Sequence, residues 1–588
     1  MDLRDWQSYV PIIPVLKNYE QEDFSHDLIA GLVVGMVTIP QAVAYAYLAG
    51  VPPESGLYAC LVPMLLYAVF GSSKQMVVGP VAVAALMVAA TVSEHAPKYS
   101  DAYLGITTII CLQSGLFLWL LRLSRMGGLV NLLSHPVITG FVNAAAILII
   151  ISQLPTFVGI DVNNSQAPWL VLSDFLSQIS GAHLLTVSFG IVALLVLLAF
   201  PTLILGLTKL LGIQLAAQHA ATRIGPMVVA AISIPIVIAF DLQGEIDVVG
   251  AIPSGLPSIT LPPFDATLWI ELLPASTMVA LVSYIESYSI GTTLAARRQT
   301  RVNAHQELIA IGAANIGAAF TGAYPVAGSF SRSSVNFYSG ARTPISSVVC
   351  GVIIMFTLLF LTSLFEGLPV AVLAAIVMVS VVGLMDLKNG PNHWQLHRED
   401  TLTEYATMFL VLFMGVEVGL IAGAVLSIAF FVRTSSRPNI TQVGRLANTE
   451  HFRSIKRYDV ETLPHVLALR IDENIYFANA TQIEDKCMKR SQRRRTTQHL
   501  LVVCSSVNMI DATGLQMLHR LNANLQRAGI TMNFCDLKGT LLPRLQEAGL
   551  LDALTGQSFI SADRAMKYFE QKAEEERETQ QETPANDL

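Results

Sequence analysis

Gly79-Pro80 precedes the short apolar run VAVAALMVAA at 81–90, and Pro325 and Gly328 precede SFSRSSVNF at 329–337. A helix that crosses the hydrocarbon core of a bilayer needs about 20 apolar residues, so neither run is long enough to cross it alone. Both runs begin behind proline and glycine within apolar sequence, which is typical of helices interrupted inside a membrane. These two stretches decide how the rest of the chain is interpreted.

The composition around them is that of a membrane protein. Of the 588 residues, 53% are hydrophobic and only 13% are charged, whereas a soluble domain carries about 25% charged residues. The 79 charged residues are divided unevenly, with 40 in 1–433 and 39 in 434–588. The chain therefore has two domains in two different solvents, and an ordinary soluble enzyme is excluded.

About fourteen apolar runs from 28 to 433 predict an α-helical polytopic domain, in which 78–93 is the third run and 328–339 the tenth. These two places are equivalent if the helices form two repeats of seven. Lysine and arginine concentrate in the loops after even-numbered runs, so we predict that both termini are cytoplasmic. The first residues show no pattern of a removable signal peptide.

The remaining segments complete the predicted organisation. We expect a cytoplasmic N-terminal segment over 1–27, the transmembrane domain over 28–433, a small α/β domain over 434–570, and a charged tail over 571–588 that is disordered or a frayed helix. The α/β domain is predicted from strand-like runs at 466–471, 500–504 and 530–535, separated by helical patterns at 478–490, 513–528 and 540–549.

The two interrupted helices predict a binding site. Each helix start leaves unpaired N–H groups and a partial positive charge, and two starts that face each other, near Gly79 and Gly328, would bind an anion without a metal or cofactor. Ser329, Ser331 and Arg332 at the second start add hydroxyl donors and a full positive charge. Alternatively, the glycines and prolines only ease helix packing, while Arg332 snorkels to the surface or pairs with an acid.

Glu286 is the strongest single candidate for a functional residue, because it lies in the apolar stretch MVALVSYIESYSIGTTL at 278–294. An intramembrane carboxylate is costly, so we interpret it as a proton or sodium site; the alternative is a fixed ion pair with Arg332. Glu417 lies where two helices should turn, which favours a surface position. In the first helix, Gln41 and Tyr45 follow Pro40 on one face and could line a pocket, although a plain kink is equally consistent.

Other classes of function find little support. The sequence has no P-loop, GxSxG, HExxH or dinucleotide-binding pattern, so we expect no enzyme. Its six cysteines show no ligand spacing, which argues against a metal site or a disulfide framework. The net charge of −7 gives no support for nucleic-acid binding. The basic run KRSQRRR at 489–495 is typical of a solvated helix end; contact with anionic membrane lipid is the alternative.

Several long motifs stand in order along the chain. They are TIPQAVAYAYLAG at 38–50 with its continuation to 86, LLSHPVITGF at 132–141, IESYSIGTTLAARR at 285–298, NAHQELIAIGAANIG with its continuation to 344, and MIDATGLQML at 509–518. With these motifs the chain resembles the sulfate permease (SulP) family of anion transporters over nearly its whole length, and its C-terminal part resembles the STAS domain.

The resemblance implies fourteen helices in two inverted repeats, a core domain that moves against a gate domain, and a homodimer. It also implies an anion site lined by Gln41, Tyr45, Val81, Ser329, Ser331 and Arg332, with Glu286 at an acidic position linked to cation coupling. Two features depart from the family. Asp511 is followed by Ala512 before Thr513, which argues against a phosphorylated serine switch, and the first helix has no carboxylate, which leaves Glu286 as the coupling residue.

Together these observations predict a secondary active transporter of a small oxyanion in the cell inner membrane. Sulfate is the expected substrate, moved by alternating access and coupled to H⁺ or Na⁺, because an interior-negative potential opposes anion entry. A bicarbonate or dicarboxylate carrier, an anion exchanger, an anion channel and a membrane anion sensor are the alternatives. A cytoplasmic partner of the STAS-like domain is also possible.

Overall fold

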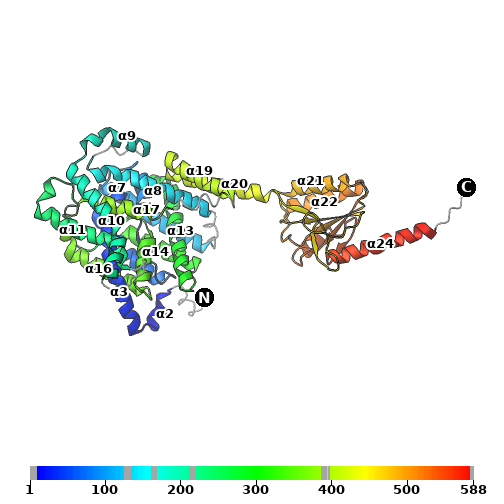
Figure 1. The fold of residues 1–588 in the computed structure, drawn as a ribbon, viewed down its shortest axis with the longest axis horizontal. Helices are drawn as coiled ribbons and strands as arrows, with labels where there is room; N and C mark the ends of the chain where they lie inside the picture. The colour runs from blue at the N-terminus through cyan, green and yellow to red at the C-terminus, as the bar shows by residue number, and fades with distance from the viewer. Residues whose placement is uncertain are drawn as a thin grey trace. The chain divides into compact units, whose positions relative to one another are not determined.

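The computed structural model describes residues 10–124, 134–160, 168–210, 220–385, 394 and 397–582. The predicted terminal segments therefore fall partly outside the described residues, at 1–9 and 583–588. The chain divides into two compact units, Met1–Ser427 and Ile428–Leu588, and Figure 1 labels many of their helices.

The first unit is helical. Its helices are α2 Ile12–Lys17, α3 Gln21–Ala49, α4 Pro53–Tyr58, α5 Val62–Phe70, α6 Ala82–Val92, α7 Asp101–Leu123, α8 His135–Val158, α9 Pro168–Gln178, α10 Leu184–Leu210, α11 Gly225–Ala239, α12 Ala266–Glu271, α13 Leu273–Arg297, α14 Ala304–Phe320, α15 Phe330–Tyr338, α16 Ile345–Phe356, α17 Val370–Val382, α19 Arg398–Met414 and α20 Val416–Ser435, which runs into the second unit. Two short strands, β1 Val78–Pro80 and β2 Val326–Gly328, are the non-helical elements that matter for the site.

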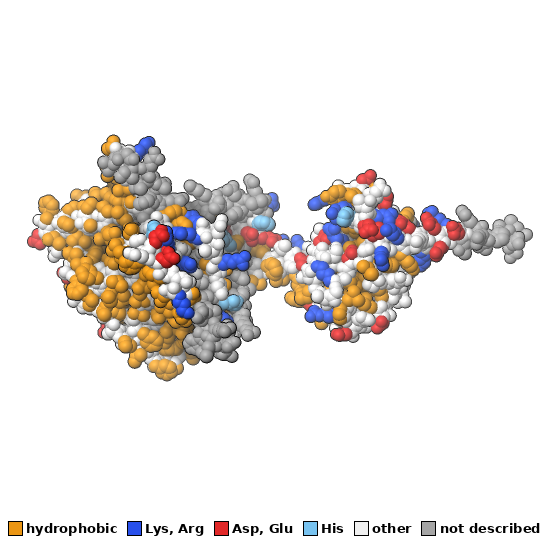
Figure 2. Space-filling model, turned by 90° about the horizontal axis from the view of Figure 1, so that it is seen from below, with side chains coloured by type: hydrophobic (Ala, Val, Ile, Leu, Met, Phe, Trp, Pro, Cys, Tyr) orange, Lys and Arg blue, Asp and Glu red, His pale blue; other side chains and the backbone are white. Residues whose placement is uncertain are grey.

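This unit has the surface of a membrane domain. Among the described residues, seven helical segments are long and apolar enough to cross a bilayer, and α6, α11 and α17 are shorter apolar helices. Large hydrophobic side chains are exposed along α10, α19 and α20, and Figure 2 shows hydrophobic side chains spread over the visible face of the helical unit. The fold class is thus a polytopic helical domain, while the count of fourteen spans stays a prediction.

Helices from the two halves of the unit pack in pairs. Helix α3 packs against α16, α7 against α14, and α8 against α19. Glycines allow the close approaches: a Cβ at Gly115 of α7 would lie 2.6 Å from the carbonyl oxygen of Gly312 in α14, and a Cβ at Gly140 of α8 would lie 2.2 Å from that of Glu404 in α19. Small residues let helices pack closely where lipid supplies no hydrophobic drive for association.

The second unit is a six-stranded sheet with the order β4-β3-β5-β6-β7-β8. Its strands are β3 Ile440–Arg445, β4 Phe452–Ser454, β5 Val466–Ile471, β6 His499–Val503, β7 Thr531–Cys535 and β8 Ser558–Phe559. Strands β5 to β8 run parallel to one another, whereas β3 is antiparallel to both β4 and β5. The three strands expected from the sequence are present; β3, β4 and β8 are additional.

Helices cover both faces of this sheet. Leu467 and Leu469 pack with residues of α21 Ala480–Arg493 and α22 Ala512–Arg527. The alternate residues Val466 and Ala468 pack with α24 Ala562–Glu582. The short α23 Leu542–Glu547 follows β7. Because successive side chains of a strand point to opposite faces, the apolar run of β5 serves two cores.

Helix α24 extends into the segment expected to be a tail. The sequence predicted either disorder or a frayed helix over 571–588, and the structure shows helix through Glu582. The first turns of α24 are anchored by Met566 and Phe569 in the core. The helix is therefore nucleated by packing, which a search for apolar periodicity in 571–588 alone cannot detect.

Candidate anion-binding site

The two short runs are joined by a small sheet. Strands β1 and β2 pair antiparallel, with Val78 opposite Gly328, Gly79 opposite Ala327 and Pro80 opposite Val326. Helix α6 begins only at Ala82, and α15 begins only at Phe330. The sequence predicted these helix starts near Gly79-Pro80 and Gly328. The helices begin two to three residues later, because the strand pairing takes up the intervening backbone.

Side chains from three helices hold this sheet in place. The Asn315 amide of α14 donates to the Val326 carbonyl and accepts from the Val326 N–H, both at 3.0 Å. The Ser287 hydroxyl accepts from the Gly328 N–H at 2.8 Å, and the Ser333 hydroxyl accepts from the Val77 N–H at 2.9 Å. Non-helical backbone is tolerated at membrane depth only where such partners exist. Polar residues within apolar helices were the sequence signal for these positions, and it was missed.

The two glycines allow the elements to come together. A Cβ at Gly79 would lie 3.2 Å from Nη2 of Arg332, and a Cβ at Gly328 would lie 2.7 Å from Sδ of Met76. Any larger residue at either position would therefore displace a neighbour. The residues that were predicted to meet, Gly79 and Gly328, do lie in adjacent paired strands.

The two helix starts differ in how their N–H groups are satisfied. Ser329 caps α15, because its hydroxyl accepts from the Arg332 N–H at 3.5 Å and its own N–H donates to the Val77 carbonyl at 3.0 Å. Val81 is the N-cap residue of α6 and offers no side-chain cap. It packs instead with Ala84 and Ala327. The first-turn N–H groups of α6 thus have no side-chain acceptor, and both helices present the positive ends of their dipoles.

Arg332 is the central side chain of the site. It is fully buried, and its Nη2 donates to the Pro80 carbonyl at 2.6 Å. Its Nε and Nη1 are buried without a hydrogen-bond partner among the described residues. A fully buried guanidinium does not snorkel to the surface, so that alternative is wrong. Buried charged donors without partners are rare and costly, and they are what an anion would satisfy.

Three further polar side chains belong to this region. Gln41 and Tyr45 lie on α3 and are buried, and Oε1 of Gln41 has no partner among the described residues. Helix α3 continues through Pro40 without ending. The buried Tyr324, just before β2, also has an unpartnered hydroxyl. Tyr45 and Tyr324 both lie close enough to Arg332 to interact with its charge. Tyr324 was not expected from the sequence, although it directly precedes Pro325.

The other predicted residues lie nearby. Ser331, in the first turn of α15, is half-buried. Glu286 lies on α13, directly before the Ser287 that binds the Gly328 N–H, and is half-buried. It interacts with the charge of Arg332, yet no ion pair within 4 Å joins the two in the part of the chain described. The alternative of a fixed Glu286–Arg332 pair is therefore wrong for this structure. Glu417 belongs to the first turn of α20, and its side chain lies outside the described residues.

Two other buried carboxylates were not expected. Helix α3, which contains the first predicted span, begins at Gln21 instead of near 28 and therefore includes Asp27. Asp27 accepts from Thr343 Oγ1 at 2.5 Å and from the Arg342 N–H at 2.8 Å. The statement that the first helix has no carboxylate was wrong, because polar residues extend it beyond the apolar run. Glu307 of α14 accepts from the Ser72 hydroxyl at 2.7 Å and from the Tyr67 hydroxyl at 3.0 Å. Both groups are fully hydrogen-bonded, unlike Glu286.

The arrangement defines what the site can do chemically. It provides hydrogen-bond donors and positive charge. In the described ranges, no group of three His, Cys, Asp or Glu side chains could hold a metal ion. In the second unit, Asp511 caps α22 through the Gly514 N–H at 2.7 Å, and Thr513 is exposed in the first turn. The geometry of the first unit is thus that of an anion-binding site buried within a membrane domain.

Comparison with known proteins agrees with this geometry. Residues 24–407 match the sequence model of the sulfate permease family, and residues 457–564 match that of the STAS domain. The chain belongs to the sulfate permease family of membrane anion transporters.

Its relatives include the Arabidopsis thaliana protein "Probable sulfate transporter 4.2", which is 32% identical over 95% of this chain and 83% of the relative. "Sulfate transporter 4.1, chloroplastic" of the same plant is 33% identical over 89% of this chain and 76% of the relative.

Solved structures show the same fold. The murine Solute Carrier 26 family member A9 anion transporter in the inward-facing state superimposes with a TM-score of 0.88 at 21% identity, covering 97% of this chain and 95% of that one. The transmembrane domain of the cyanobacterial bicarbonate transporter BicA gives a TM-score of 0.57 at 19% identity, covering 70% of this chain and 98% of that one. The expectation of a multi-pass anion transporter with a STAS domain is confirmed.

Proposed function

We propose that this protein is a secondary active transporter of sulfate that works by alternating access around the starts of α6 and α15. The observation that carries the proposal is the buried Arg332 guanidinium, whose Nε and Nη1 have no partner among the described residues. The relatives named as sulfate transporters support sulfate as the substrate.

The charge of the site supports a divalent anion. Arg332 contributes one full positive charge, and each helix start contributes roughly half an elementary charge. With Glu286 neutralised by the coupling cation, the sum is close to that needed to balance sulfate, whereas a monovalent anion would leave part of the positive charge uncompensated in a buried site. Gln41, Tyr45, Val81, Ser329 and Ser331 line the substrate in this proposal, with Gly79 and Gly328 giving it access to the backbone.

Coupling to H⁺ or Na⁺ is assigned to Glu286. Moving a dianion inward against an interior-negative potential costs about 4.6 kcal/mol per 100 mV, since each charge contributes about 2.3 kcal/mol. One cotransported cation offsets half of this cost. Glu286 suits the task because, unlike Asp27 and Glu307, it has no hydrogen bond from described residues and stands within electrostatic reach of Arg332.

The proposal includes the setting in the cell. We place the protein in the cell inner membrane with both termini in the cytoplasm, which follows from the distribution of lysine and arginine between loops. A homodimer is the expected assembly, on the resemblance to the family. Transport requires no cofactor other than the coupling ion.

Uptake by sealed proteoliposomes tests the proposal. Radiolabelled sulfate uptake is measured under imposed pH, sodium and voltage gradients, with unlabelled bicarbonate, oxalate and succinate as competitors. We expect sulfate accumulation above equilibrium driven by a proton or sodium gradient. Flux without accumulation would indicate a channel, binding without flux would indicate a sensor, and stronger inhibition by bicarbonate or a dicarboxylate than by unlabelled sulfate would reassign the substrate.

A further inference from the structure

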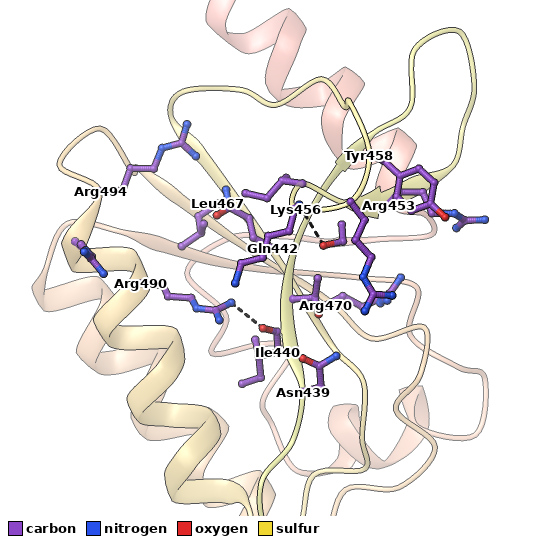
Figure 3. Close-up of a pocket in the computed structure, with 15 residues that line it drawn as sticks. Asn439, Ile440, Gln442, Arg453, Lys456, Tyr458, Leu467, Arg470, Arg490 and Arg494 are labelled. Carbon is purple, nitrogen blue, oxygen red and sulfur yellow. Dashed lines mark hydrogen bonds between the residues drawn. The ribbon is translucent and has the colours of Figure 1, made fainter. Parts of the chain in front are cut away.

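The second unit contains a cavity whose walls are strongly basic. It has a volume of about 690 Å³ and is formed by β3, the residues from β4 into the following turn, and the C-terminal end of α21 with the next residue. Figure 3 shows Arg453, Lys456, Arg470, Arg490 and Arg494 arranged around it. Pockets of this size accommodate small organic ligands.

The charge of the lining is one-sided. Seven of the fifteen lining residues are arginine or lysine, and none of these described lining residues is acidic. Arg470 pairs with Asp472, and Arg490 donates to the Ile440 carbonyl at 2.8 Å. The side chains of four others have neither an ion pair nor a hydrogen bond to any described residue: Lys456, Arg457, Arg493 and Arg494.

Lys456, Arg457 and Arg493 are exposed to solvent, yet their charges converge on one concave surface. Like charges repel, and lysine and arginine on an ordinary surface are interspersed with acids. A concave surface of one sign focuses its potential and concentrates counterions. Arginine binds phosphate groups through parallel N–H donors, and several such side chains around one cavity match a ligand with more than one negative charge.

The sequence position of the cavity adds a second observation. Its first lining residue, Asn439, follows the end of the last apolar span, Ser435, by four residues. Four extended residues cover at most about 14 Å. Asn439, the lining residue nearest this span in the sequence, is therefore within reach of the phosphate layer at the end of the span.

We propose that this cavity binds a ligand bearing a phosphate group with at least two negative charges, with Arg493 and Arg494 on one wall and Lys456 and Arg457 on the other. The basic run KRSQRRR at 489–495 then has a specific role: three of its arginines, Arg490, Arg493 and Arg494, line the cavity, while Lys489 and Arg495 lie outside the lining. The phosphate comes from an anionic lipid headgroup or from a soluble polyphosphate. This inference does not depend on which anion is transported.

The test uses the full-length protein in nanodiscs of phosphatidylcholine at 150 mM salt. Isothermal titration calorimetry measures binding of sodium tripolyphosphate in one arm and of dioctanoyl phosphatidic acid in the other. The double variant Arg493→Gln/Arg494→Gln removes two lining charges. The control Lys489→Gln/Arg495→Gln removes two charges from the same helix end outside the cavity.

We expect at least one probe to bind, with its Kd raised at least tenfold in Arg493→Gln/Arg494→Gln and changed less than twofold in the control. The probe that shows this difference identifies the source of the phosphate. Lys456→Gln/Arg457→Gln, on the opposite wall, should give the same loss and replaces the first variant if that variant fails to fold. Absence of binding by both probes, or an equal loss in the lining and control variants, would overturn the proposal.

Discussion

Replacing Arg332 by methionine tests the anion site directly. Methionine has a similar length but cannot donate a hydrogen bond and carries no charge. The unpartnered Nε and Nη1 of Arg332 are the two donors available to an anion. Hydrogen bonds to charged groups contribute about 1.5–3 kcal/mol each, so losing two costs roughly 3–6 kcal/mol. Since 1.4 kcal/mol corresponds to tenfold in Kd, sulfate should bind roughly 10² to 10⁴ times more weakly.

The same variant has an opposite effect on the anion-free protein. Wild-type Arg332 is buried with two unsatisfied donors, each of which costs about 1–3 kcal/mol. Arg332→Met removes both, at the loss of the single hydrogen bond to the Pro80 carbonyl. The anion-free variant should therefore be at least as stable as wild type. Sulfate at 100 times Kd stabilises wild type by about 2.7 kcal/mol, and this increment should disappear.

Two measurements on purified protein decide the matter. Isothermal titration calorimetry gives the Kd for sulfate, and thermal unfolding with and without sulfate gives the shift in Tm. Arg301→Met is the control, because Arg301 is exposed and lies outside the site. A folded Arg332→Met protein that binds sulfate within threefold of wild type would refute the assignment of this guanidinium to the substrate.

Three other predictions address ion coupling, the Asn315 amide that holds β2, and the second unit. Glu286→Gln should abolish gradient-driven sulfate accumulation in proteoliposomes while sparing sulfate counterflow, because the variant cannot release or bind the coupling cation; unchanged accumulation would contradict the coupling role. Asn315→Leu leaves both backbone groups of Val326 unpaired, so we expect a loss of roughly 2–6 kcal/mol of stability together with weakened sulfate binding, and a wild-type Tm would show that the strand pair does not need this amide. Partial burial and then the positive charge of Lys572 lower the pKa of His499 to about 4. The unfolded chain takes up this proton near pH 6.5, so the unfolded state binds more protons and the free energy of unfolding falls as pH drops from about 6.5 to 4. The protection factors of β6 amides, which correct the exchange rates for their intrinsic pH dependence, should fall over that range in wild type and less so in His499→Phe, and an equal fall would exclude the histidine as the cause.

Much of the fold could be predicted from the sequence, because the signals lie within each segment itself. The apolar runs, the loop charges and the short β-branched runs at 466–471, 500–504 and 530–535 report directly on the solvent around each segment. The strands β3 and β4 were missed because their residues are mostly polar and are held by antiparallel pairing to distant partners. Helix α24 was partly missed because its stability comes from two core residues near its start.

The sequence identified individual residues of the site but not the hydrogen bonds that hold its backbone in place. Gly79, Gly328, Arg332 and Glu286 were identified because glycine, proline and charge are conspicuous in apolar sequence. The supporting residues Asn315, Ser287 and Ser333 were not, since a single amide or hydroxyl in a membrane helix has many uses.

Composition and spacing alone therefore specify a membrane domain with two interrupted helices, a small α/β domain and a set of isolated polar residues. Packing alone reveals that residues almost 250 positions apart form one antiparallel strand pair and that Arg332 is buried against Pro80 with two nitrogens that no described residue accepts from. It also reveals that Asp27 and Glu307 accept hydrogen bonds, whereas Glu286 accepts none from the described residues. The physical reason is that a hydrogen bond depends on where both partners lie in space, whereas the linear sequence records only one partner at a time.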